Sequence, residues 1–147
     1  MGTRCITEVR SKWDRDSEYV TNAVIYRHWD GYPLGHGKLL ADFLSGLRVV
    51  NGIGTHVTGR YANGPGRLAA QLVATMQEAG VDPDLQAAGV PVPHMFRYRI
   101  DVNFGHAGGD VTVTVFNPAR PEKRHRAVEI FSGSVPEFAL WVERLSD

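Results

Sequence analysis

The feature that most constrains the fold is the stretch 26–76, which contains two helix starts. Each start follows a polar turn built from glycine and proline, DGYP at 30–33 and NGPG at 63–66. Proline suits the first helical position, where a missing N–H donor costs nothing. The pattern therefore predicts one helix over 33–47 and a second over 65–80, joined by a long loop.

Strand-like patterns lie on both sides of this stretch. In the clearest one, Phe96, Tyr98, Ile100 and Val102 alternate with polar residues, which indicates a half-buried strand. The expected strands span 3–9, 20–29, 95–104, 111–116 and 127–131.

A capping box begins the last element. Ser134 stands three residues before Glu137, and apolar residues follow at helical spacing. This pattern predicts a closing amphipathic helix. The stretch 81–94 shows no period, and we expect it to be a connection.

The resulting order of elements is ββααβββα in a single domain, 1–147. A chain of this length builds one core. Short hairpin links favour antiparallel strand pairing. We therefore expect an α+β fold, with a twisted antiparallel sheet of about five strands and about three helices packed on it.

The composition of the chain gives no support for a nucleic-acid or membrane partner. The formal net charge is zero, so electrostatics gives no argument for a nucleic-acid partner, and we do not expect one. The chain has no apolar run near the ~20 residues of a membrane span, and its first residues lack a signal-peptide layout. We expect a cytoplasmic protein without a membrane partner.

Metal and cofactor chemistry have little support in the sequence. The six histidines form no ligand pair at helical or strand spacing, and the lone Cys5 excludes a cysteine-based zinc cluster. His28, His36 and Asp30 could converge across the first turn, but a hydrogen-bonded histidine is the simpler reading. The usual nucleotide-enzyme fingerprints are missing. We expect no metal and no cofactor.

The best functional clue is a stretch without acidic residues that runs into the second helix. No carboxylate occurs between Asp42 and Glu78. The basic residues there include Arg48, His56, Arg60 and Arg67. Free N–H groups and the positive end of a helix dipole make a glycine-rich helix start a plausible anion site.

The first hypothesis is therefore a small-ligand-binding protein. An anionic or nucleotide-like ligand would lie between the two helix N-termini, and sequestering a signalling nucleotide is one use. The candidate ligand-binding residues are Arg27, Asp30, Tyr32, His36, Asn63, Gly64, Gly66, Arg67 and Gln71. Arg97 and Arg99, on the polar face of one strand, would strengthen the site if that face borders the Asn63 turn.

Two alternatives stay open, so whether the protein is an enzyme is uncertain. One is a hydrolase or transferase acting on a phosphorylated substrate, with His36 as the acid or base and Asp30 orienting it. The other is a protein-interaction or inhibitor factor, or a homo-oligomer, using an aromatic patch of Trp13, Trp29 and Tyr32.

Several of these residues resemble a family of small proteins encoded by bacteria, phages and plasmids. The pattern is MGTR, then YRxxDGYPxGHG from Tyr26, then ANGxGxLAAQL from Ala62. It covers the first half of the chain well and the second half loosely. The resemblance implies a phage or mobile-element role by association, and it brings no established activity. Arg67 stands where the family pattern has a small or apolar residue. The resemblance therefore says least about the role of Arg67.

Overall fold

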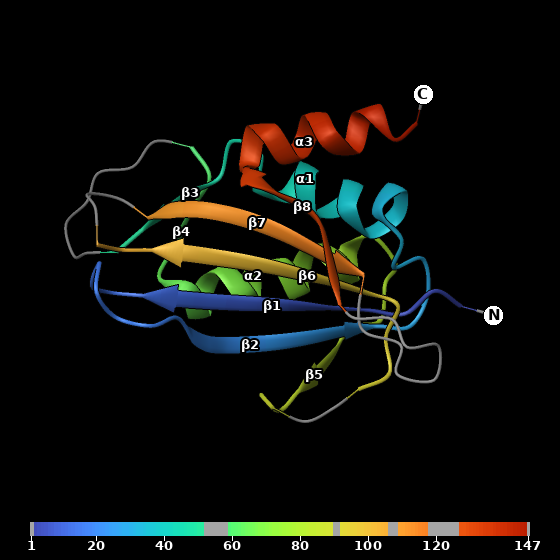
Figure 1. Cartoon of the computed structure of the whole chain (residues 1–147), viewed down its shortest axis with the longest axis horizontal. Helices are drawn as coiled ribbons and strands as arrows, with labels where there is room; N and C mark the ends of the chain where they lie inside the picture. Colours follow the sequence, from blue (N-terminus) through green and yellow to red (C-terminus); the bar gives the residue numbers. More distant parts are fainter. Residues whose placement is uncertain (1, 52–58, 90–91, 106–108, 118–126, 147) are drawn as a thin grey trace.

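The computed structural model describes residues 2–51, 59–89, 92–105, 109–117 and 127–146. This part of the chain forms an α+β fold, in which the helices pack on one face of a six-stranded sheet (Figure 1). The order across the sheet is β5-β2-β1-β6-β7-β8. Its strands are β1 (Cys5–Lys12), β2 (Val20–Arg27), β5 (Asp84–Gln86), β6 (Phe96–Asn103), β7 (Asp110–Asn117) and β8 (Val128–Ser134).

Three α-helices and one turn of π-helix make the second layer. They are the π-helix η1 (Pro33–Gly37), α1 (Lys38–Leu44), α2 (Pro65–Glu78) and α3 (Val135–Arg144). A small parallel sheet pairs β3 (Arg48–Val50) with β4 (Tyr61–Asn63). None of the described helices is long and apolar enough to cross a membrane.

The α+β class is as predicted, but the main sheet is mixed and has six strands, which corrects the prediction of an antiparallel sheet of about five strands. The pairs β1–β2, β6–β7 and β7–β8 are antiparallel, as short links require. However, β1 and β6 are parallel. The chain between β2 and β6 includes α1 and α2, and a crossover of that length allows parallel pairing.

Other boundaries also differ from the predictions. The first helix begins as a π-helix, and α1 ends at Leu44 rather than near position 47. Part of the predicted loop 48–63 forms β3 and β4, and the connection 81–94 contains β5. The extended piece expected at 53–57 lies outside the described residues.

The alternation of side chains divides the sheet into two faces. Val9, Ile100 and Val113 point toward the helices and are fully buried. Leu72 and Phe138, from α2 and α3, belong to the same core. Within the described chain, the opposite face carries no helix (Figure 1). We call it the open face.

The capping box is confirmed. The N–H of Glu137 donates to Ser134 Oγ at 3.3 Å, and the N–H of Ser134 donates to Glu137 Oε1 at 3.0 Å. Both partners are local, which is why the sequence could predict this helix start.

Candidate functional site

The end of β2 places Arg27 in the core layer rather than at a surface turn. Arg27 shares the helix-covered face of β2 with Ile25 and is 9% exposed. Its Nε donates to the carbonyl of Trp29, and its Nη1 lies 3.3 Å from His36 Nδ1. The guanidinium therefore ties the end of the strand to the turn that follows.

His36 is fully buried and bonded at both ring nitrogens. Its Nε2 lies 2.7 Å from Thr7 Oγ1, and its ring meets Tyr98 edge-on at 4.9 Å between centroids. Because a guanidinium only donates, Nδ1 accepts from Arg27, and Nε2 carries the proton given to Thr7. Burial and then the charge of Arg27 lower the pKa of His36 to about 3. The imidazole is thus neutral, and it connects η1, β1 and β2.

The glycines of this turn are required by close approach of the chain to itself. A Cβ on Gly31 would lie 2.7 Å from the Cβ of Cys5, and one on Gly35 would lie 2.5 Å from the Asp30 carbonyl oxygen. Asp30 adopts a φ of +56°, in the left-handed region that an asparagine or aspartate tolerates. The turn therefore serves packing within the protein.

The predicted pairing of His36 with the Asp30 side chain is not what orients the imidazole. The contact with Asp30 runs through the backbone, from the N–H of His36 to the Asp30 carbonyl at 3.0 Å. Thr7 and Arg27 hold the ring instead. A general acid or base must come within reach of its substrate, and this ring is enclosed. Tyr32 lies at the surface, 41% exposed.

The second helix start holds the remaining predicted residues. Gly64, with a φ of +93°, stands before α2, and Gly66 and Arg67 are exposed on its first turn. Asn63, the last residue of β4, is half-buried. Gln71 Nε2 donates to the Tyr61 carbonyl at 3.1 Å and so ties α2 to β4.

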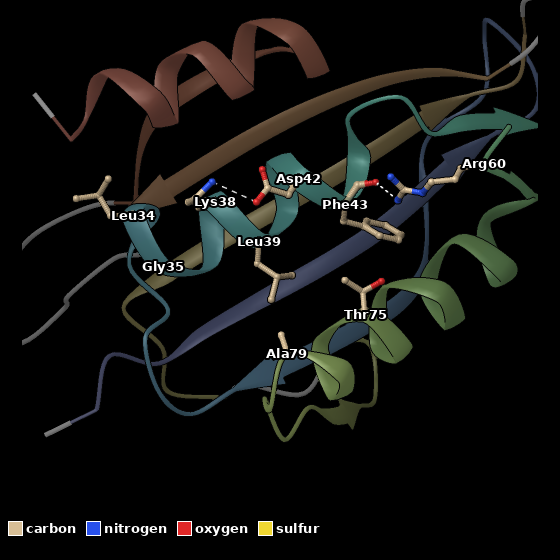
Figure 2. A pocket seen from close by; sticks show the side chains of 9 residues that line it. All are labelled: Leu34, Gly35, Lys38, Leu39, Asp42, Phe43, Arg60, Thr75 and Ala79. Atoms are coloured by element: carbon tan, nitrogen blue, oxygen red, sulfur yellow. Dashed lines mark hydrogen bonds and ion pairs between the residues drawn. The ribbon is translucent and has the colours of Figure 1, made fainter.

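The structure does not bring the two helix starts together. Figure 2 shows α1 and α2 running in opposite directions, so Leu34 and Gly35 at the first start lie across from Ala79, just beyond the end of α2. The start of α2 lies at the opposite end of that helix. A single ligand cradled by both helix N-termini therefore has no geometric basis.

The groove between these helices has a volume of about 460 Å³ (Figure 2). Its lining residues are Leu34, Gly35, Lys38, Leu39, Asp42, Phe43, Arg60, Thr75 and Ala79. Lys38 pairs with Asp42 at 3.2 Å. Arg60 Nη2 donates to the Phe43 carbonyl at 2.7 Å, near the end of α1. Both cations of the groove, Lys38 and Arg60, thus already have partners. The other residues that line the groove are mostly apolar.

A second cavity, of about 410 Å³, contains Arg27 and Asp30 beside Asp82, Asp84 and the end of α2. Three carboxylates and the negative end of a helix dipole surround it. That surrounding charge disfavours an anion.

The three aromatic residues predicted to form a patch are exposed but do not lie together. Trp13, Trp29 and Tyr32 are 54%, 60% and 41% exposed. Trp13 stacks on Phe104 with 4.6 Å between centroids, beyond the end of β1. Trp29 follows the end of β2, which pairs with the start of β1. Trp13 and Trp29 therefore lie at opposite ends of that strand pair.

The open face carries a group of charged side chains on β1 and β6. Strand register places Glu8 beside Arg99, and Arg10 beside Asp101. Arg10 and Asp101 form a bidentate pair, with contacts of 2.6 and 2.8 Å. These two charges satisfy each other.

Arg97 lies between Ile6 and Phe116 in the same register, so no carboxylate stands directly opposite it. Arg97 Nε and Arg99 Nη2 each lie 3.5 Å from the same atom, Glu8 Oε1. Both guanidiniums lie over the ring of Phe116, 4.6 and 4.9 Å from its centroid. We call Glu8, Arg97, Arg99 and Phe116 the arginine cluster.

The arginine cluster has more positive than negative charge. Burial and then the charge of neighbouring Arg10 lower the pKa of Arg99, while Glu8 opposes this shift. The sequence placed Arg97 and Arg99 on a polar strand face but did not indicate Glu8, because β1 and β6 are far apart in the sequence. This face is turned away from the helices, so it does not border the Asn63 turn.

No group of three or more histidine, cysteine or acidic side chains in the described ranges could hold a metal ion. Comparison of the chain with protein-family models, with curated proteins and with solved structures finds no match. The family resemblance stays a prediction.

Proposed function

We propose that this protein binds a small anionic or nucleotide-like ligand, and that the arginine cluster on the open face holds it. The observation that carries the proposal is that Arg97 and Arg99 share one carboxylate at 3.5 Å. Glu8 offers one negative charge to two guanidiniums. An anion that contacts both guanidiniums supplies the second negative charge. This location replaces the helix starts suggested by the sequence.

The supporting geometry is that of a prepared site. Both arginines stand on the central strand β6, and Phe116 beneath their guanidiniums limits their rotation. Guanidiniums held in place lose less conformational entropy when they bind an oxyanion. Their partial burial also strengthens the attraction relative to a fully solvated pair.

Aromatic rings on the same face suit a ligand that has a ring as well as an anionic group. Arg10 and Lys12 lie over the ring of Tyr19, at 4.9 and 4.8 Å from its centroid. A nucleotide offers both a planar base and a phosphate. Such a protein would act by sequestering its ligand.

Isothermal titration against a panel of nucleotides tests the proposal. Arg97→Gln should weaken binding about 10- to 100-fold, the scale of a lost hydrogen bond to a charged group. Lys38→Gln is the matched control, because Lys38 is a cation on the helix side of the protein. Folded protein that binds no member of the panel at millimolar concentration would defeat the proposal, as would equal affinities of wild type and Arg97→Gln.

A further inference from the structure

Three atoms of the arginine cluster lack a hydrogen bond, and they define what a ligand has to offer. Nε of Arg97, Nε of Arg99 and Oε1 of Glu8 are buried and make no hydrogen bond. The 3.5 Å contacts among these side chains are longer than the 2.7–3.2 Å of a hydrogen bond. Guanidinium nitrogens only donate, and an ionised carboxylate only accepts. A ligand that satisfies the cluster needs acceptors and a donor close together.

We propose that the cluster selects an oxyanion that also carries an O–H group, and that Glu8 is the specificity-determining residue. The inference rests on the anion binding proposed above. The oxyanion accepts hydrogen bonds from Arg97 and Arg99, and its O–H donates to the carboxylate of Glu8. Hydrogen phosphate is the simplest such ligand, and a sugar phosphate is a larger one.

Sulfate is the discriminating comparison. At pH 8, sulfate and hydrogen phosphate are both tetrahedral dianions of similar size, but only hydrogen phosphate carries an O–H group. At Glu8, sulfate therefore presents only an oxygen acceptor, which the carboxylate repels. Hydrogen phosphate presents an O–H donor to the same carboxylate. A site built to hydrogen-bond a substrate hydroxyl strongly rejects an analogue that lacks it, because the buried polar group stays unpaired.

The three atoms themselves are covered, so binding requires these partly exposed side chains to turn toward a ligand on the open face. The side chains of Arg97, Arg99 and Glu8 are 28%, 22% and 15% exposed. Glu8 Oε1 lies 3.5 Å from both Arg97 and Arg99. An anion bound by both guanidiniums therefore meets Glu8 as well. An electrostatic site without Glu8 would bind oxyanions by charge alone.

Calorimetric titration with phosphate and with sulfate at pH 8 tests the inference on three proteins: wild type, Glu8→Gln and Asp42→Asn. Wild type should prefer phosphate by about tenfold or more, the scale of a hydrogen bond to a charged group. Glu8→Gln should bind both anions within about threefold of each other, mainly by gaining affinity for sulfate. Asp42→Asn removes a carboxylate on the helix side and should keep the wild-type preference.

Ribose 5-phosphate and ethyl phosphate distinguish the two forms of the ligand. If the O–H belongs to a sugar, ribose 5-phosphate should bind at least tenfold more tightly than ethyl phosphate; if it belongs to the phosphate itself, the two should bind alike and more weakly than inorganic phosphate. Equal wild-type affinities for phosphate and sulfate would overturn the role of Glu8 and leave anion binding intact. Absence of binding by all four probes and by the nucleotide panel would overturn the proposed function itself.

Discussion

Replacing His36 by alanine tests whether the buried imidazole holds the turn after β2. The change empties a fully buried position and removes the contacts to Thr7 Oγ1, Arg27 and the Tyr98 ring. Emptying a large core position costs about 2–5 kcal/mol, and each buried polar group left unpaired costs about 1–3 kcal/mol. Because these terms overlap, we expect a loss of about 3–5 kcal/mol in the free energy of unfolding.

Urea unfolding at pH 7, followed by circular dichroism, measures this loss. His28→Ala is the matched control, because His28 is exposed and contacts Tyr26 Oη at 2.8 Å. Its substitution should change the free energy of unfolding by less than about 0.5 kcal/mol. A loss below about 1 kcal/mol for His36→Ala would refute the structural role of the imidazole.

The pH dependence of stability gives a second readout of the same residue. The pKa of His36 is about 3 in the folded protein, against an ordinary value of 6.5. Between these values the unfolded chain binds the extra proton, so the contribution is complete above pH 6.5 and is lost as the pH falls toward 3. The slope is at most about 1.4 kcal/mol per pH unit. His36→Gln removes this titration, so its stability deficit relative to wild type should shrink between pH 7 and pH 4. A constant deficit would refute a neutral, buried His36.

Three further predictions concern packing and capping. Gly31→Ala should cost about 1–3 kcal/mol, because the new Cβ meets Cys5 at 2.7 Å. Gly66→Ala has open space around the new Cβ and should stabilise the protein by about 0.4–1 kcal/mol. Thermal melts compare the two variants, and equal melting shifts would contradict the packing of the turn. Leu72→Ala should cost about 2–5 kcal/mol through a cavity in the fully buried face of α2, and a melting shift under a degree or two would show that the face is not buried. Ser134→Ala should cost about 1 kcal/mol by removing the cap of α3, and an unchanged urea midpoint would contradict the capping box.

Elements whose signals are local were predictable from the sequence. The capping box of α3 and the proline that begins α2 at Pro65 both lie where the sequence indicated. Both depend on residues within one helical turn of each other. The alternation of β6 likewise identified the strand and the two faces of its side chains.

Features that depend on distant pairing were not predictable. Alternation along a strand puts Arg27 and Tyr26 on opposite faces, but it does not say which face the helices cover. Since the helices cover the face that carries Arg27, its guanidinium lies in the core layer and not at a surface turn. The arginine cluster was missed for the same reason, because Glu8 meets Arg99 only through the parallel pairing of β1 with β6.

Mapping the ligand by nuclear magnetic resonance tests the central claim most directly. Isotope-labelled protein would be titrated with ribose 5-phosphate while the backbone amides and the arginine Nε–H groups are observed. Binding at the open face predicts that the largest shift changes occur at Glu8, Arg97, Arg99 and Phe116. Shift changes confined to Gly64 and Gly66, at the start of α2, would contradict it and return the site to the helix N-terminus that the sequence first suggested.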